Sequence, residues 1–93
     1  MQTTKVPGKK VKKVMMFTLS TCIWCKKTKQ LLVDLGVEYD YTFVDMLQGP
    51  EKDETMKIVA KWNPECSFPT LVVNDSQCIV GFKEKEIKEA LKL

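Results

Sequence analysis

Two cysteines stand one helical turn apart, at Cys22 and Cys25, between a short apolar run and a lysine-rich amphipathic segment. A Cys-x-x-Cys pair can be half of a zinc site, half of a disulfide scaffold or a redox dithiol, and the surrounding residues decide among these. The apolar run is typical of a strand, and the periodicity that follows it is typical of a helix. The pair is therefore predicted at a junction between a strand and a helix.

The length and composition of the chain allow one soluble domain. A chain of 93 residues can build a single modest core, and 44% hydrophobic residues are enough to fold it without structural disulfides. We find no apolar run near the roughly 20 residues that a bilayer span requires, so we expect no membrane partner. Because the amino terminus gives no clear evidence of export, we expect a cytoplasmic protein whose thiols work in a reducing compartment.

Charge is unevenly distributed along the chain. Eight of the fifteen lysines lie at or before Lys29, and that stretch has no acidic residue. This raises nucleic-acid binding as a hypothesis, but the chain has no arginine and its lysine cluster has no interleaved aromatic residues. We therefore expect no nucleic-acid partner. Residues 1–11, with Pro7-Gly8 in the middle, are predicted to be a flexible basic segment that precedes a domain over residues 12–93.

Hydrophobic periodicity predicts seven elements within residues 12–93. Strands are expected where short apolar or alternating runs occur, and helices where apolar residues recur every three or four positions. Gly36 and Pro64 are predicted to lie just after the ends of the first two helices. The predicted strands are 12–19, 37–45, 69–73 and 77–80, and the predicted helices are 23–35, 49–62 and a last one after Phe82.

The order of these elements fixes the fold class. A right-handed crossover makes the first two strands parallel, while the short polar turn at 74–76 joins the last two as an antiparallel hairpin. The prediction is an α/β fold with a four-stranded mixed sheet flanked by three helices (βαβαββα), with helices on both faces.

The two cysteines are predicted to have different roles. Cys22 at a helix N-terminus lies near unpaired amide N–H groups and upstream of three lysines, a setting that favours a thiolate and makes Cys22 the candidate nucleophile. Cys25 is one turn further into the helix, faces the same side and should be more buried. It can attack a mixed disulfide at Cys22 and release reduced product, so it is the candidate resolving thiol.

The order of the elements, the cysteine pair, Ser67-Phe68-Pro69-Thr70 before the third strand and Val80-Gly81-Phe82 after the fourth together resemble the glutaredoxin family of the thioredoxin fold. The resemblance implies a dithiol-disulfide oxidoreductase with no bound cofactor or metal. It also implies a cis peptide before Pro69, beside the dithiol, that offers backbone hydrogen bonds to an extended thiol substrate. The substrate-binding residues that we expect are Trp24, Phe68, Pro69, Gly81 and Phe82.

Several positions depart from the common glutaredoxin pattern. Ile23 and Trp24 stand where many members have proline and tyrosine, and the Trp24 indole is either an exposed platform for a partner or part of the packed helix face. Leu19 stands where a lysine is common, and Gly81-Phe82-Lys83 where Gly-Gly and an acidic residue are common. These departures resemble glutaredoxin-like redoxins that draw electrons from a thioredoxin reductase, so the expected reductant is thioredoxin reductase or glutathione.

The remaining cysteines leave one rival function. Cys78 is predicted to be a buried core thiol, and Cys66 an inert loop cysteine or a regulatory thiol near the active site. A four-cysteine zinc site is disfavoured because the later cysteines are twelve positions apart and the chain has no histidine. An iron-sulfur module, in which Cys22 and an external thiol bridge two chains, stays open. We otherwise expect a monomer that acts on disulfide-containing proteins.

Overall fold

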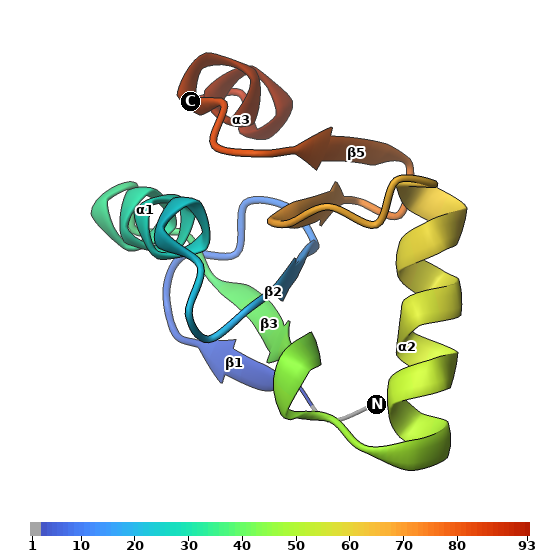
Figure 1. Ribbon diagram of the computed structural model, residues 1–93. Helices are drawn as coiled ribbons and strands as arrows, with labels where there is room; N and C mark the ends of the chain where they lie inside the picture. Colours follow the sequence, from blue (N-terminus) through green and yellow to red (C-terminus); the bar gives the residue numbers. More distant parts are fainter. Residues whose placement is uncertain (1–2) are drawn as a thin grey trace.

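The computed structural model describes residues 3–93, which form a five-stranded mixed sheet with helices on both faces (Figure 1). The strands lie in the order β1-β3-β2-β4-β5. The elements are β1 Thr4–Val6, β2 Val14–Thr18, α1 Ile23–Asp34, β3 Tyr39–Phe43, the 3-10 helix η1 Val44–Met46, α2 Gly49–Trp62, β4 Thr70–Val73, β5 Gln77–Val80 and α3 Glu84–Leu91.

The strand pairing confirms the predicted α/β, thioredoxin-like fold. The strand β2 is parallel to β3 and antiparallel to β4, and β4 and β5 form the antiparallel hairpin. Met16 in the centre of β2 lies opposite Tyr41 on one side and Leu71 on the other. Both Met16 and its neighbour Phe17 are almost fully buried, as a strand covered on both faces requires.

The sequence prediction missed the fifth strand. Residues 4–6, expected to belong to a flexible segment, pair antiparallel with β3, and Val6 lies opposite Tyr39. The connection between β1 and β2 is also held in place, because the Lys9 amide donates a hydrogen bond to the Gly36 carbonyl at 2.8 Å. A three-residue strand is too short to show periodicity, and its pairing depends on backbone groups. Residues 1 and 2 of the predicted segment lie outside the described residues.

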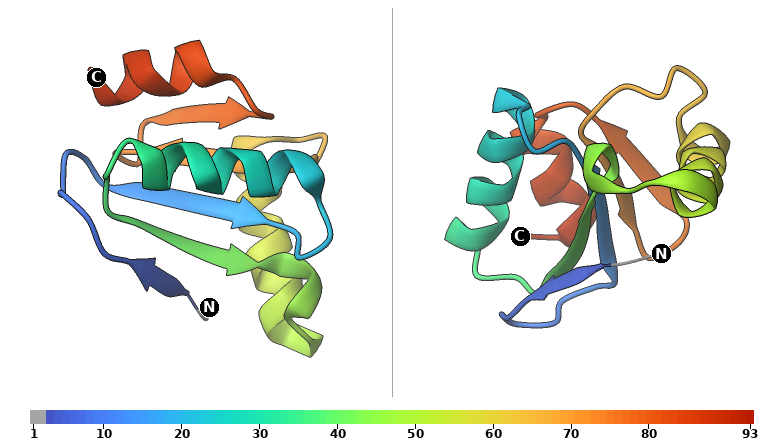
Figure 2. Two further views of the ribbon diagram at one scale, coloured as in Figure 1. Left: turned by 90° about the vertical axis from the view of Figure 1, so that its left-hand side faces the viewer. Right: turned by 60° about the horizontal axis from the view of Figure 1, so that its bottom comes forward.

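The helices divide the core into two layers, with α1 and α3 on one face of the sheet and α2 on the other (Figures 1 and 2). The alternation of β2 assigns its side chains to these layers. Val14 and Met16 belong to the cluster under α1 and α3, which also holds Cys25. Phe17 belongs to the cluster with Val59 of α2. The first cluster is the one that carries the cysteine pair.

Within the described part of the chain, no helix combines the length and apolar character needed to cross a bilayer.

Candidate active site

Cys22 is the N-cap residue of α1, as predicted. Its backbone is extended, and its Sγ atom accepts a hydrogen bond from the Cys25 amide at 3.2 Å. The Lys26 amide donates to the Cys22 carbonyl at 3.1 Å and begins the helical hydrogen-bond pattern. The Cys22 side chain is half-buried, so it is open to a substrate on one side. A sulfur atom held against the amides of a helix N-terminus is in a position that stabilises negative charge.

Cys25 lies one turn further on and is completely buried. Burial raises the pKa of the Cys25 thiol from 9.0 to about 11, and a hydrogen bond with Cys22 adds to the increase. The Thr18 hydroxyl and the Leu19 backbone favour the ionised sulfur and act on the pKa in the opposite direction. All four cysteines of the chain are free thiols in the structure. The predicted difference in burial between the two thiols of the pair is therefore present.

The lysines that follow the cysteine pair contact aromatic rings. Lys27 Nζ lies 4.7 Å from the centroid of the Trp24 ring. Lys29 Nζ lies 3.7 Å from the centroid of the Tyr41 ring, on strand β3. Such cation–π contacts direct both ammonium groups to rings. The hydrogen bond to the Cys22 sulfur comes instead from a backbone amide.

The second predicted motif is brought to the same end of the sheet. The peptide between Phe68 and Pro69 is cis, as the resemblance implies, and Pro69 is buried. The Gly81 amide donates to the Pro69 carbonyl at 2.9 Å, which ties the end of β5 to the start of β4. Phe68 and Phe82 both pack against the apolar cluster that Cys22 contacts. All the predicted site residues outside α1 thus lie in one connected group.

Trp24 is exposed and is not packed into the buried face of α1. Its relative exposure is 53%, and the neighbouring Ile23 reaches 63%. The Trp24 ring stacks with Phe82, with ring centroids 6.3 Å apart and an angle of 22° between the planes. We call Ile23, Trp24 and Phe82 the aromatic surface. It adjoins Cys22 because Ile23 and Trp24 directly follow that residue.

Sequence reasoning missed a carboxylate that holds the loop in front of Cys22. The Asp45 carboxylate in η1 accepts hydrogen bonds from the Ser20 amide at 3.0 Å and from the Ser20 hydroxyl. The hydroxyl bond is the main reason why the pKa of Asp45 is lowered. The two residues are 25 positions apart, so no local pattern could reveal the contact.

The two remaining cysteines lie elsewhere. Cys78 was predicted to be a buried core thiol, but it is only half-buried because β5 is the last strand of the sheet. This partial burial raises the pKa of its thiol. Cys66 has a positive φ of 51° and packs against the cluster on the α2 face, whereas Cys22 packs against the other cluster. Among residues 3–93, no three side chains of the metal-binding types gather as a metal site.

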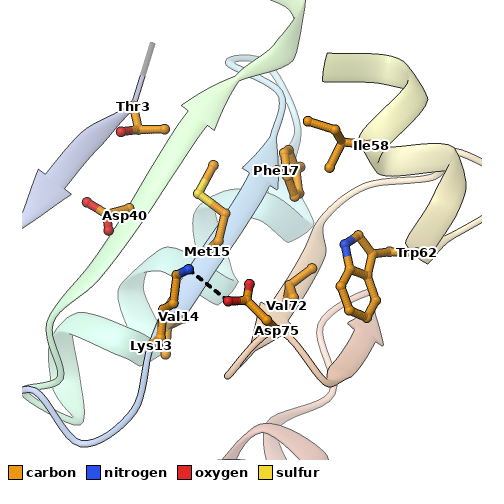
Figure 3. Close-up of a pocket in the computed structure, with 10 residues that line it drawn as sticks. All are labelled: Thr3, Lys13, Val14, Met15, Phe17, Asp40, Ile58, Trp62, Val72 and Asp75. Atoms are coloured by element: carbon orange, nitrogen blue, oxygen red, sulfur yellow. Dashed lines mark hydrogen bonds and ion pairs between the residues drawn. The ribbon is translucent and has the colours of Figure 1, made fainter. Parts of the chain in front are cut away.

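A pocket of about 230 Å³ lies between the sheet and α2 (Figure 3). Met15, Ile58 and Trp62 form part of its apolar wall, and the Lys13–Asp75 ion pair, at 2.8 Å, lies at its polar side. Its lining includes neither cysteine of the pair. The pocket and the cysteine pair therefore lie in different parts of the molecule.

Comparison with known proteins agrees with this architecture. A family model described as Glutaredoxin matches residues 14–79. The crystal structure of a glutaredoxin from Methanosarcina mazei Go1 is 53% identical, with 100% of this chain and 90% of that chain covered and a TM-score of 0.92. The crystal structure of methanoredoxin from Methanosarcina acetivorans is 55% identical, with 92% of this chain and 90% of that chain covered and a TM-score of 0.88.

A curated relative is more distant. A glutaredoxin-like protein of 8.6 kDa in the rubredoxin operon of Clostridium pasteurianum is 28% identical over 79 residues, which cover 85% of this chain and 97% of that protein.

Proposed function

The chain belongs to the glutaredoxin family, and on that basis we propose that it is a dithiol oxidoreductase that reduces disulfides in proteins or small molecules through Cys22 and Cys25. The observation that carries this proposal is the unequal placement of the two thiols. Cys22 is half-buried, with its sulfur on a helix N-terminal amide, while Cys25 is fully buried one turn inside the same helix. One thiol can meet a substrate, and the other can meet only the first thiol.

The proposed reaction has two exchanges. The Cys22 thiolate attacks one sulfur of the substrate disulfide, and the other substrate sulfur leaves as a thiolate. Cys25 then attacks the Cys22 sulfur, so that a Cys22–Cys25 disulfide forms and the second substrate sulfur leaves. A reductant supplies two electrons to restore the dithiol. The raised pKa of Cys25 keeps it protonated during the first exchange, which leaves Cys22 as the attacking group.

The aromatic surface, together with Phe68, Pro69 and Gly81, is proposed to bind the substrate. Exposed aromatic rings beside a nucleophile offer an apolar contact for a partner protein. The Pro69 carbonyl already accepts from the Gly81 amide, so we expect an extended substrate to pair with the backbone of Phe68. In our proposal, specificity for a protein substrate depends on this surface, whereas small disulfides need only Cys22.

Replacement of Trp24 tests this difference between protein substrates and small disulfides. Trp24→Ala should slow the reduction of a protein disulfide several-fold, and it should leave the reduction of a small alkyl disulfide nearly unchanged. Val33→Ala is a matched control because Val33 is a similarly exposed apolar residue, at 52%, near the other end of α1. Equal losses with both substrates, or the same loss in the control, would contradict a role of the aromatic surface in substrate binding.

The proposed reductant is a thioredoxin reductase, with glutathione as the alternative. At the position where the family often has a lysine, Leu19 is partly buried and packs against the cluster on the α2 face. An apolar side chain there offers no cation to a glutathione carboxylate. Coupled assays with NADPH and either thioredoxin reductase, or glutathione with its reductase, would separate the two donors. We further propose that the protein works as a monomer in the cytoplasm.

Mass spectrometry tests the mechanism directly. We would equilibrate the protein across a glutathione redox series and map all four cysteines. Reversible formation of a Cys22–Cys25 disulfide, with Cys66 and Cys78 still reduced, is the expected result. Cys22→Ser should abolish turnover, and Cys25→Ser should trap a mixed disulfide at Cys22. Normal dithiol activity in either variant would refute the mechanism.

A further inference from the structure

Thr18, the last residue of β2, carries a buried hydroxyl group without a partner. The residue is completely buried, and its Oγ1 atom makes no hydrogen bond to any described residue. It follows Val14 and Met16 on the same face of the strand, and these two residues lie in the cluster that contains Cys25. A buried hydroxyl without a partner is unfavourable for stability, so its presence calls for an explanation.

Cys25 is the group that this hydroxyl can stabilise. The Thr18 hydroxyl favours the ionised form of the Cys25 sulfur and so opposes the rise of the Cys25 pKa that burial causes. A neutral thiol is a weak acceptor, whereas a thiolate accepts a hydrogen bond strongly. A donor that has no partner while Cys25 is protonated therefore gains one when Cys25 ionises. Placing a donor where charge develops is a general device for stabilising a reacting atom.

We propose that Thr18 is a catalytic residue of the resolving step, in which its hydroxyl donates a hydrogen bond to the Cys25 sulfur as that sulfur attacks the mixed disulfide. The inference rests on the dithiol mechanism proposed above and assigns a function to a residue outside the Cys-x-x-Cys motif. In the proposed step the hydroxyl donates to a reacting atom, and it keeps its own proton throughout.

The atoms and electrons of the step balance. Cys25 loses its proton, and its sulfur uses the electron pair to form a bond with the Cys22 sulfur. The bond between Cys22 and the substrate sulfur breaks, and the substrate sulfur leaves with that bond's electron pair and takes up the proton. The substrate is reduced and the cysteine pair is oxidised.

The proposed role is confined to the second exchange. The first exchange uses the thiolate of Cys22 and leaves Cys25 protonated, so loss of the Thr18 hydroxyl should not affect it. In the mixed disulfide Cys22 has no proton to lose, and Cys22 is the one ionisable side chain among the described residues that acts on the Cys25 thiol. The pH dependence of resolution therefore reports on Cys25. A hydrogen bond to a charged group is expected to change this rate by about 10- to 100-fold.

Dipyridyl disulfide separates the two exchanges. It releases one pyridinethione when Cys22 is captured and a second when Cys25 resolves the adduct, and stopped-flow absorbance follows both. In Thr18→Val the first release should keep its rate, while the second should slow by about 10- to 100-fold and need a higher pH. Thr18→Ser should retain the fast second release. Thr42→Val is a matched control because Thr42 is also buried but lies opposite Phe17, on the α2 face.

The outcomes are distinguishable. If Thr18→Val does not fold, the comparison of Thr18→Ser with Thr18→Ala isolates the hydroxyl at nearly equal volume. Equal second releases in the Ser and Ala variants would overturn the role of Thr18, and so would a parallel slowing of both releases. Absence of a second release in the unchanged protein would overturn the dithiol mechanism itself.

Discussion

The burial of Cys25 predicts slow alkylation of its thiol in the folded protein. Its pKa rises from 9.0 to about 11, mainly because of burial. At pH 8 this change lowers the fraction of thiolate about 100-fold. The higher pKa also makes the remaining thiolate more nucleophilic, by about 6- to 10-fold for a Brønsted slope near one half. The net chemical effect is a rate about 10-fold lower than in the unfolded chain, and steric shielding of the fully buried side chain should lower it further.

The assay is limited modification with iodoacetamide at pH 8, followed by peptide mapping of the reduced protein with and without urea. Low extents of reaction are needed so that modification of Cys22 does not alter its neighbour. Cys25 should react at least about 10-fold more slowly in the folded protein than in the protein unfolded by urea. A Cys25 rate equal to that in urea would refute the argument that burial suppresses the thiolate.

Three further predictions concern stability. Because the folded pKa of Cys25 is raised, its contribution to the free energy of unfolding is complete below pH 9.0 and is lost as the pH rises through about 11. Urea unfolding should therefore show that the free energy of unfolding decreases by at most about 2 to 3 kcal/mol over that pH range. The decrease should be smaller in Cys25→Ala. Asp45→Asn weakens the bonds from Ser20 and should lower the free energy of unfolding by about 0.5 to 1 kcal/mol at neutral pH. Since the pKa of Asp45 is lowered, this difference should vanish as the pH falls below 3.8, and its persistence at low pH would contradict the assignment. Gly8→Ala places a Cβ atom 2.6 Å from the Val37 carbonyl carbon, so it should displace the β1 connection and lower the urea midpoint. An unchanged midpoint and unchanged hydrogen exchange in β1 would show that the close approach is not required.

The features that could be predicted from the sequence are those with a local cause. The predicted helix from Ile23 and the stop at Gly36 agree with α1 and with the positive φ of 70° at that glycine. The hairpin at 74–76 is confirmed for the same reason, since a short polar turn between two apolar runs has few other conformations. The position of Cys22 at the N-cap follows from the same local pattern. Its prediction requires only the spacing of apolar residues along one helix.

The features that could not be predicted depend on contacts between distant segments. The strand β1 exists because β3 offers it an unpaired edge, and its own three residues carry no pattern. The contact between Ser20 and Asp45 joins a loop to η1. Thr18 is a strand residue like many others, and only its alternation with Val14 and Met16 in β2 places it on the face whose cluster contains Cys25. The periodicity of a strand predicts that alternate residues are buried, but it does not tell which neighbour they meet.

The spacing of the cysteine pair accounts for the difference between its two members. A separation of three residues puts both sulfurs on one side of α1 but at different depths, since the first lies before the helix and the second lies within it. The helix start gives Cys22 an amide donor and an open side, while the same helix buries Cys25 against the sheet. In the proposed mechanism, burial makes Cys25 a poor nucleophile toward disulfides in solution and so preserves the order of the two exchanges. It also makes ionisation of Cys25 the difficult part of the second exchange. A single hydroxyl at the end of β2 is therefore best placed to act on that step.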